Sequence, residues 1–146
     1  MKMKILFSRV DPFSEPGGFD MGNFSIESEG KKISSQGNSR NLMMIYIAIS
    51  DLIFGVLGLQ GARGTCNFVG ADSSFSLNFR SKGNELEISH NKGSKIICDK
   101  IDFLNALCSG VDDFLSSGNE LKMSDSAYSD LHAAVEKLKQ VRSGGY

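Results

Sequence analysis

The sequence predicts an α+β fold: an antiparallel β-sheet of about five to seven strands, a long central helix packed on it, and two C-terminal helices. Three observations favour this class. Residues 42–59, LMMIYIAISDLIFGVLGL, are the longest apolar stretch of the chain. Between residues 66 and 98, short segments of alternating polar and apolar residues are separated by turn residues, as in antiparallel strands. After residue 99, apolar residues recur every three or four positions, as in amphipathic helices.

Length and composition limit the architecture and the partners. The 146 residues suit one domain, residues 1–146, with a core of its own. Sixteen basic and 17 acidic residues give a formal net charge of -1, which argues against general binding of nucleic acid or of anionic membranes. Cys66, Cys98 and Cys108 are odd in number and lack the spacings of a disulfide framework or a zinc site. We therefore predict reduced thiols.

The N-terminal segment bears on the location of the protein. Its apolar run before Arg9 and Asp11 covers only residues 5–7, which is too short for the apolar region of a signal peptide. With the reduced thiols, this predicts a cytoplasmic protein.

The first 40 residues predict three strands and a loop. Residues 2–10 alternate, with Met3, Ile5 and Phe7 on one side, as in a half-buried strand. Residues 11–18 hold both prolines and two adjacent glycines, so they form a loop. Residues 21–29 predict a second strand, and a turn at 29–31 leads to a short third strand around Ile33.

The central helix is predicted over residues 42–59, with Asn38 or Ser39 as its N-cap. At about 100° per residue, its most apolar face holds Leu42, Ile45, Ile49, Ile53 and Val56. Asp51, Gly55 and Gly58 fall on the other face. A membrane span is the alternative, but Asp51 near its middle would cost roughly 2.5 to 3.5 kcal/mol. We favour a core helix with Asp51 as an exposed carboxylate.

Four strands are predicted after the central helix. They cover residues 66–69, 74–80, 85–90 and 94–98. Turn residues at 60–65, 81–84 and 91–93 precede or separate them, which predicts an antiparallel meander.

The C-terminal third predicts two amphipathic helices. Asp99 stands at the N-cap of the first, Asp102 complements the helix dipole, and Gly118 ends the helix. The second helix covers residues 126–141, and the tail 143–146 is expected to fray.

The sequence contains no recognisable catalytic constellation. Neither His90 nor His132 has an acid or cysteine at a spacing that defines a site. The adjacent Asp112 and Asp113 point about 100° apart on a helix, so they cannot form a catalytic pair by themselves. No glycine loop matches a nucleotide-binding pattern. We predict no catalytic residue, no metal ligand and no cofactor; an enzyme whose site assembles from scattered residues is the alternative.

One charge pattern stands out between residues 11 and 30. This segment has five acidic residues and no lysine or arginine. They are Asp11, Glu15, Asp20, Glu27 and Glu29. Two interpretations are open: a solvated loop and strand edge, or a docking patch whose acids attract a basic partner such as a nuclease.

Three segments carry a resemblance to a known class of proteins: IAISDLIFGVLGLQ at 47–60, SFSLNFRSKGNELEISHNKGSKII at 74–97, and DKIDFLNALCSGVDDFL at 99–115. Their order resembles small bacterial proteins in which a helix with an SDL-type motif precedes a meander and a helix with a DFL-type motif. Many of these are immunity partners of secreted polymorphic toxins, including those of contact-dependent growth inhibition. The resemblance covers about residues 41 to 116. It implies a cytoplasmic protein that binds and neutralises one toxin domain and has no activity of its own.

The resemblance assigns no functional residue, since such families share no catalytic motif, and it leaves the first 40 residues outside. An alternative from another class is a single-strand nucleic-acid binder, with Phe75 and Phe79 stacking on bases and Arg80 contacting phosphate. Both phenylalanines share the alternation of the apolar strand face, which favours a place in the core instead.

Overall fold

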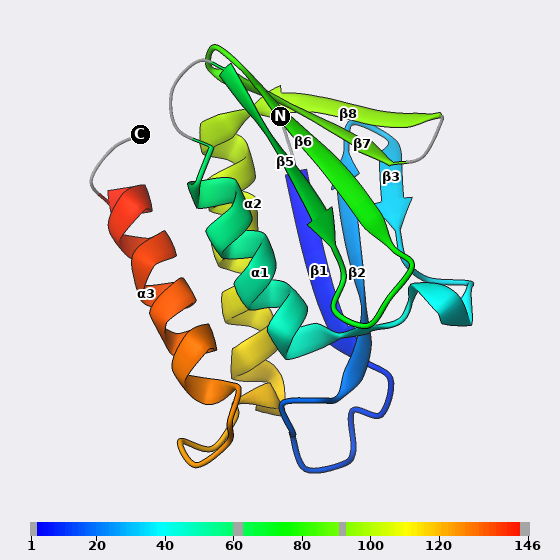
Figure 1. The fold of residues 1–146 in the computed structure, drawn as a ribbon, viewed down its shortest axis with the longest axis vertical. Helices are drawn as coiled ribbons and strands as arrows, with labels where there is room; N and C mark the ends of the chain where they lie inside the picture. The colour runs from blue at the N-terminus through cyan, green and yellow to red at the C-terminus, as the bar shows by residue number, and fades with distance from the viewer. Residues whose placement is uncertain (1–2, 60–62, 91–92, 144–146) are drawn as a thin grey trace.

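The computed structural model describes residues 3–59, 63–90 and 93–143 (Figure 1). Through these residues the chain forms two four-stranded antiparallel sheets and three α-helices. The predicted α+β class is confirmed. The strands number eight rather than five to seven, and they belong to two sheets rather than one.

The first sheet is built from the N-terminal strands. Its order is β1-β2-β3, and the short β4 pairs with the beginning of β2. The bounds are Met3–Arg9 for β1, Met21–Ser28 for β2, Lys31–Ser34 for β3 and Met43–Met44 for β4. Phe7 lies opposite Phe24 in the register, and their rings stack with centroids 5.1 Å apart. The predicted inward side of β1 is confirmed, because Ile5 is buried and Met3 and Phe7 pack against the core.

The second sheet is the predicted meander. Its strands follow one another in the order β5-β6-β7-β8, each antiparallel to the next. The bounds are Arg63–Val69 for β5, Ser76–Lys82 for β6, Glu85–His90 for β7 and Ser94–Asp99 for β8. Side chains of β6 alternate between the two faces of the sheet. Leu77 and Phe79 are buried on the inner face, whereas Asn78 and Arg80 are exposed on the outer face.

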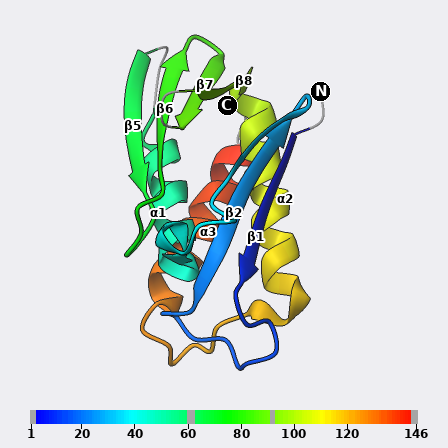
Figure 2. The same cartoon turned by 90° about the vertical axis from the view of Figure 1, so that its right-hand side faces the viewer.

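Three helices cover one side of the sheets. They are α1 (Ile45–Leu57), α2 (Lys100–Phe114) and α3 (Tyr128–Ser143). Figures 1 and 2 show the order of the layers: the sheets lie on one side, α1 and α2 pack against them, and α3 forms the outermost layer on the other side of α1 and α2. Gly110 lets α2 pack closely on β1, because a Cβ there would overlap the backbone carbonyl of Ile5.

The central helix starts later than predicted. Met43 and Met44 pair with Met21 and Gly22 as strand β4, so the helix begins at Ile45. Asn38 does cap a helical turn, but the turn is a short 3-10 helix, Ser39–Asn41, in which the side chain of Asn38 accepts a hydrogen bond from the amide of Arg40. The predicted apolar face is buried from Ile45 to Val56, and Asp51 is exposed.

The C-terminal helices also differ at their ends. Asp99 occupies the N-cap position of α2, but its side chain makes no capping hydrogen bond. Beyond Phe114 the chain makes a π turn, Leu115–Asn119, in which Gly118 has a φ of 85° and ends the helical path. The last helix starts at Tyr128 rather than 126.

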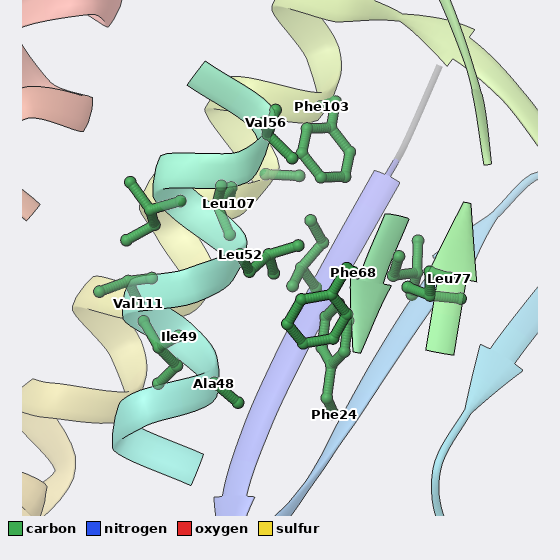
Figure 3. Packing of buried hydrophobic residues seen from close by; sticks show 14 of the residues in the cluster. Phe24, Ala48, Ile49, Leu52, Val56, Phe68, Leu77, Phe103, Leu107 and Val111 are labelled. Atoms are coloured by element: carbon green, nitrogen blue, oxygen red, sulfur yellow. The ribbon is translucent and has the colours of Figure 1, made fainter. Parts of the chain in front are cut away.

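Both sheets and all three helices contribute to one hydrophobic core. Figure 3 shows its centre, where Phe24 of β2 and Phe68 of β5 meet Leu52 of α1. Phe103 and Leu107 of α2 are fully buried beside them. Each such side chain stabilises the fold by roughly 1.5 to 3 kcal/mol relative to exposure.

Some predictions fall outside the described residues. These are the parts of the predicted turns at 60–62 and 91–92, the first residue of the predicted N-terminal strand, Lys2, and the fraying of the tail at 144–146. Among the described residues, we find no helix with both the length and the apolar composition that crossing a membrane requires.

Candidate docking surface

The side chain of Arg9, at the end of β1, organises the loop between β1 and β2. It is 2% exposed. Its Nε donates to Oδ1 of Asn119 (2.8 Å), and Nη1 donates to Oγ of Ser14 and Oδ2 of Asp20 (both 3.1 Å). Nη2 donates to the carbonyls of Pro12 (3.3 Å) and Ser14 (3.0 Å). The Asp20 carboxylate compensates the buried charge, and the loop is tied to one guanidinium at three points along its length.

Asn119 connects this guanidinium to the helices. Its Nδ2 donates to the carbonyl of Phe114 at the end of α2 (2.8 Å), and its own carbonyl accepts a hydrogen bond from the Tyr46 hydroxyl of α1 (2.6 Å). Burial raises the pKa of Tyr46 to about 12, so the hydroxyl stays protonated and remains a donor. The loop is therefore fixed to both central helices.

The second half of the loop is fixed by Asp125, in the segment between α2 and α3. The amide of Gly18 donates to Oδ2 of Asp125 (3.0 Å), whose Oδ1 accepts from the amide of Ala127 (2.9 Å). Only glycine fits at residue 18. A Cβ there would overlap Oδ1 of Asp125 and would lie 2.7 Å from the Cβ of Ala127. Figure 2 shows the two segments side by side at one end of the molecule.

This fixed loop presents large apolar side chains to solvent. Phe13 is 96% exposed and Phe19 65%, and Val10 is also exposed. Met123, in the neighbouring segment, is 81% exposed. Exposed aromatic residues on a backbone that is already ordered are typical of binding hot spots, because little conformational entropy is lost on association.

Three of the five predicted acids lie in this loop. Asp11 is exposed, and its Oδ1 accepts a hydrogen bond from the amide of Phe13 (3.0 Å), which orients the start of the loop. Glu15 forms an ion pair with Lys122, and this hydrogen-bonded contact lowers the pKa of the Glu15 carboxyl. Asp20 is engaged by Arg9.

We define the docking surface as the exposed acidic and large apolar side chains of this loop together with Met123. Its members are Val10, Asp11, Phe13, Glu15, Phe19 and Met123.

The other two acids lie far from this surface. Glu27 and Glu29 are at the opposite end of β2, since the seven residue-to-residue steps from 20 to 27 span about 23 Å in an extended chain. The register places Lys4 and Lys32 on either side of Glu27, and Lys32 Nζ lies 3.6 Å from its carboxylate. Glu29 is in the turn between β2 and β3, with a φ of 50°. The five acids are thus divided between two ends of the first sheet.

Glu27 and Glu29 instead line a cleft of about 1050 Å³, with β1 and the β2–β3 hairpin on one side and α2 on the other. Charges of both signs line this cleft, so it favours no single sign of partner. They belong to Lys4, Glu27, Glu29, Lys31, Lys32, Asp102 and Asp113.

The aromatic residues of the nucleic-acid alternative are in the core. Phe79 is 0% exposed and Phe75 is buried between the sheets, next to Phe24 and His90. Arg80 alternates with Phe79 and lies on the outer face of the sheet. The two rings therefore cannot stack on a base while the sheet is intact.

The remaining reactive side chains make structural contacts. His90 Nδ1 lies 3.0 Å from the carbonyl of Ser76, and His132 stacks on Tyr128 with ring centroids 5.6 Å apart. Across residues 3–59, 63–90 and 93–143, we find no group of three or more His, Cys, Asp or Glu residues that could hold a metal ion.

Sequence reasoning found the acids of the loop but missed its aromatics and Arg9. Phe13 and Phe19 were passed over because phenylalanine usually belongs to the core. A signal was present, since Pro12 and Pro16 flank Phe13 in a segment without strand or helix periodicity. An aromatic residue there has no regular element to carry it into the core.

Comparison of the chain with known protein families, with curated proteins and with solved structures finds no match. The structure therefore defines a class only: an α+β domain with an ordered loop that exposes aromatic and acidic side chains.

Proposed function

We propose that this chain is a cytoplasmic immunity protein, without catalysis of its own, that binds one bacterial toxin domain and blocks its active site or substrate groove. The observation that carries the proposal is Phe13, 96% exposed on a loop that a buried Arg9 holds in place. The resemblance of residues 41 to 116 to immunity partners of polymorphic toxins supports the choice of partner.

The loop has the properties that tight inhibition requires. A loop ordered before binding loses little entropy on association, and an exposed aromatic side chain is the usual anchor of an interface. Asp11 and Glu15 beside it would attract a basic groove, such as one that binds the phosphates of nucleic acid. We therefore favour a nuclease as the toxin.

Growth of cells tests the proposal first. Cells that express the toxin domain encoded beside this gene should stop growing, and co-expression of this chain should restore growth. The purified pair should then form a complex in a binding titration. Absence of both rescue and binding would contradict the proposal.

The acids of the docking surface can be tested separately. D11N keeps the oxygen that accepts from the amide of Phe13. E15Q keeps a similar shape and loses only an exposed ion pair with Lys122, so D11N/E15Q removes two charges with little change of structure. We expect this variant to associate with the toxin domain several-fold more slowly at low salt, with a weaker dependence on ionic strength.

The matched control is E27Q/E29Q, which removes two charges at the far end of β2. Its association rate should equal that of the wild type. Equal slowing by both variants would indicate net charge rather than a local docking surface, and no slowing by either would contradict a role for these acids.

A further inference from the structure

Strand β5 is an edge of the second sheet with free backbone groups. It pairs with β6 and with no other strand of the described chain. The amide of Gly70 donates to the carbonyl of Phe75 (2.9 Å). Because backbone groups alternate in direction along an antiparallel strand, the amides and carbonyls of Gly64, Cys66 and Phe68 also point toward β6. The backbone groups of the intervening residues therefore point away from the sheet. These residues are Arg63, Thr65, Asn67 and Val69.

Other sheet edges are covered, whereas β5 has a single charged residue, Arg63 at its first position, as protection. Helix α2 packs along β1, with Gly110 against the carbonyl of Ile5, and β8 lies beside β3. Exposed edge strands are normally protected by lysine, proline or inward-pointing charges. The sequence of β5, RGTCNFV, has no lysine, no proline and no acid. Figure 2 shows β5 at the outer margin of its sheet.

The charges near this edge are arranged to suit a second copy of the same strand. Arg63 begins β5, and Asp72 follows its end in an exposed turn. Neither has an ion-pair partner among the described residues. When two copies of β5 run antiparallel, the Arg63 of each lies toward the Asp72 end of the other. The two arginines are then separated by about 20 Å, six residues of strand.

We propose that β5 pairs antiparallel with β5 of a second copy, so that the second sheets of two molecules join into one continuous sheet. The register that pairs all seven residues places Thr65 opposite Asn67 of the other copy, with Cys66 on the two-fold axis. This register is compatible with the ladder, since Thr65 and Asn67 both point their backbone groups outward. The proposal is independent of the docking surface, which lies at another part of the molecule (Figure 1).

Sedimentation equilibrium of three versions of the full chain tests the dimer and its register. The wild type should reach twice its monomer mass of 15.9 kDa as its concentration rises. T65E/N67E places Glu opposite Glu twice across the two-fold axis, and its dissociation constant should rise at least about fivefold. T65K/N67E places Lys opposite Glu twice and should dimerise at least as well as the wild type.

Circular dichroism of each version should show the same folded spectrum, because both side chains are exposed on the outer face of β5. A wild type that stays at 15.9 kDa at every concentration would overturn the proposal. Dimerisation of T65E/N67E equal to that of the wild type would also overturn it, as would dissociation of T65K/N67E. If β5 paired only with a strand of another protein, the purified wild type would stay monomeric, which is the first of these contradicting results.

Discussion

Burial of the Arg9 guanidinium removes a full positive charge from water, and the structure compensates it with one carboxylate and four neutral acceptors. Lysine could not replace it, because a single ammonium group lacks the planar set of five donors that reaches Asn119, Ser14 and Asp20 together. At the scale of single residues, Arg9 therefore determines the conformation of the loop that carries the docking surface.

Replacement of Arg9 by Met should destabilise the protein by about 3 kcal/mol. The loop carbonyls would lose their donor, and the partly buried Asp20 carboxylate would lose its cation and keep only the hydrogen bond from the amide of Gly17. Urea unfolding monitored by circular dichroism measures this change. R9K keeps the positive charge but loses the planar set of guanidinium donors, so its free energy of unfolding should lie between those of R9M and the wild type. A loss below about 1 kcal/mol in R9M would contradict the role given to Arg9.

Asp51 is a residue whose charge opposes folding. Burial against α3 raises the pKa of its carboxyl, and the charge of Asp130 raises it further. A carboxyl whose pKa is raised in the folded state favours the protonated form there, so its ionisation costs stability as the pH rises above the unfolded value of 3.8.

D51N should therefore stabilise the protein at pH 7, by less than about 1 kcal/mol because the carboxylate is largely solvated. The gain should disappear below pH 3.8, where Asp51 is protonated in both states. Thermal unfolding at both pH values measures the difference, and D130N should give a smaller gain in the same direction. Stabilisation that is equal at both pH values would contradict the electrostatic explanation.

At the scale of elements, the contact between α1 and β5 depends on one glycine. A Cβ at Gly55 would lie 2.8 Å from the Sγ of Cys66, closer than side-chain carbons approach sulfur. Gly58, one turn later, has a helical φ of -72°, and a Cβ there would meet its nearest atoms at 3.4 Å. The two glycines of the apolar stretch thus have different roles.

G55A should destabilise the protein by about 1 to 2 kcal/mol, because overlap with Cys66 outweighs the gain in helix propensity of about 1 kcal/mol. G58A should change stability by less than about 0.5 kcal/mol. Chemical denaturation compares the two, and the added substitution C66A should restore much of the loss in G55A. Equal changes in stability in G55A and G58A would contradict the overlap with Cys66 and would leave helix propensity as the explanation for both.

Periodicity predicted the elements whose pattern is local. The alternation of β6 and β7 and the three-and-four spacing of α2 were sufficient, because one buried face defines each of them. The start of α1 was predicted wrongly because Met43 and Met44 continue the apolar run, and only their pairing with the distant Met21 and Gly22 makes them a strand. The division into two sheets depends on the same kind of long-range pairing.

At the scale of the whole molecule, the arrangement of the sheets decides which side chains can act together. Asp11 and Glu27 belong to one acidic segment in the sequence, yet the length of β2 separates them. Phe13 and Met123 are far apart in the sequence, yet the contacts of Arg9 and Asp125 bring their segments side by side. The acids of the loop were predictable from charge counting; the composite surface required the fold.

The most direct test is the affinity of the proposed partner, a toxin domain encoded beside this gene, for F13A, compared with the wild type and with F54A. Phe54 is a partly exposed phenylalanine on α1, outside the docking surface, and serves as the matched control. We predict that F13A weakens binding by about 2 kcal/mol, roughly 30-fold, while F54A binds like the wild type. Wild-type affinity of F13A would contradict the claim that this loop is the docking surface.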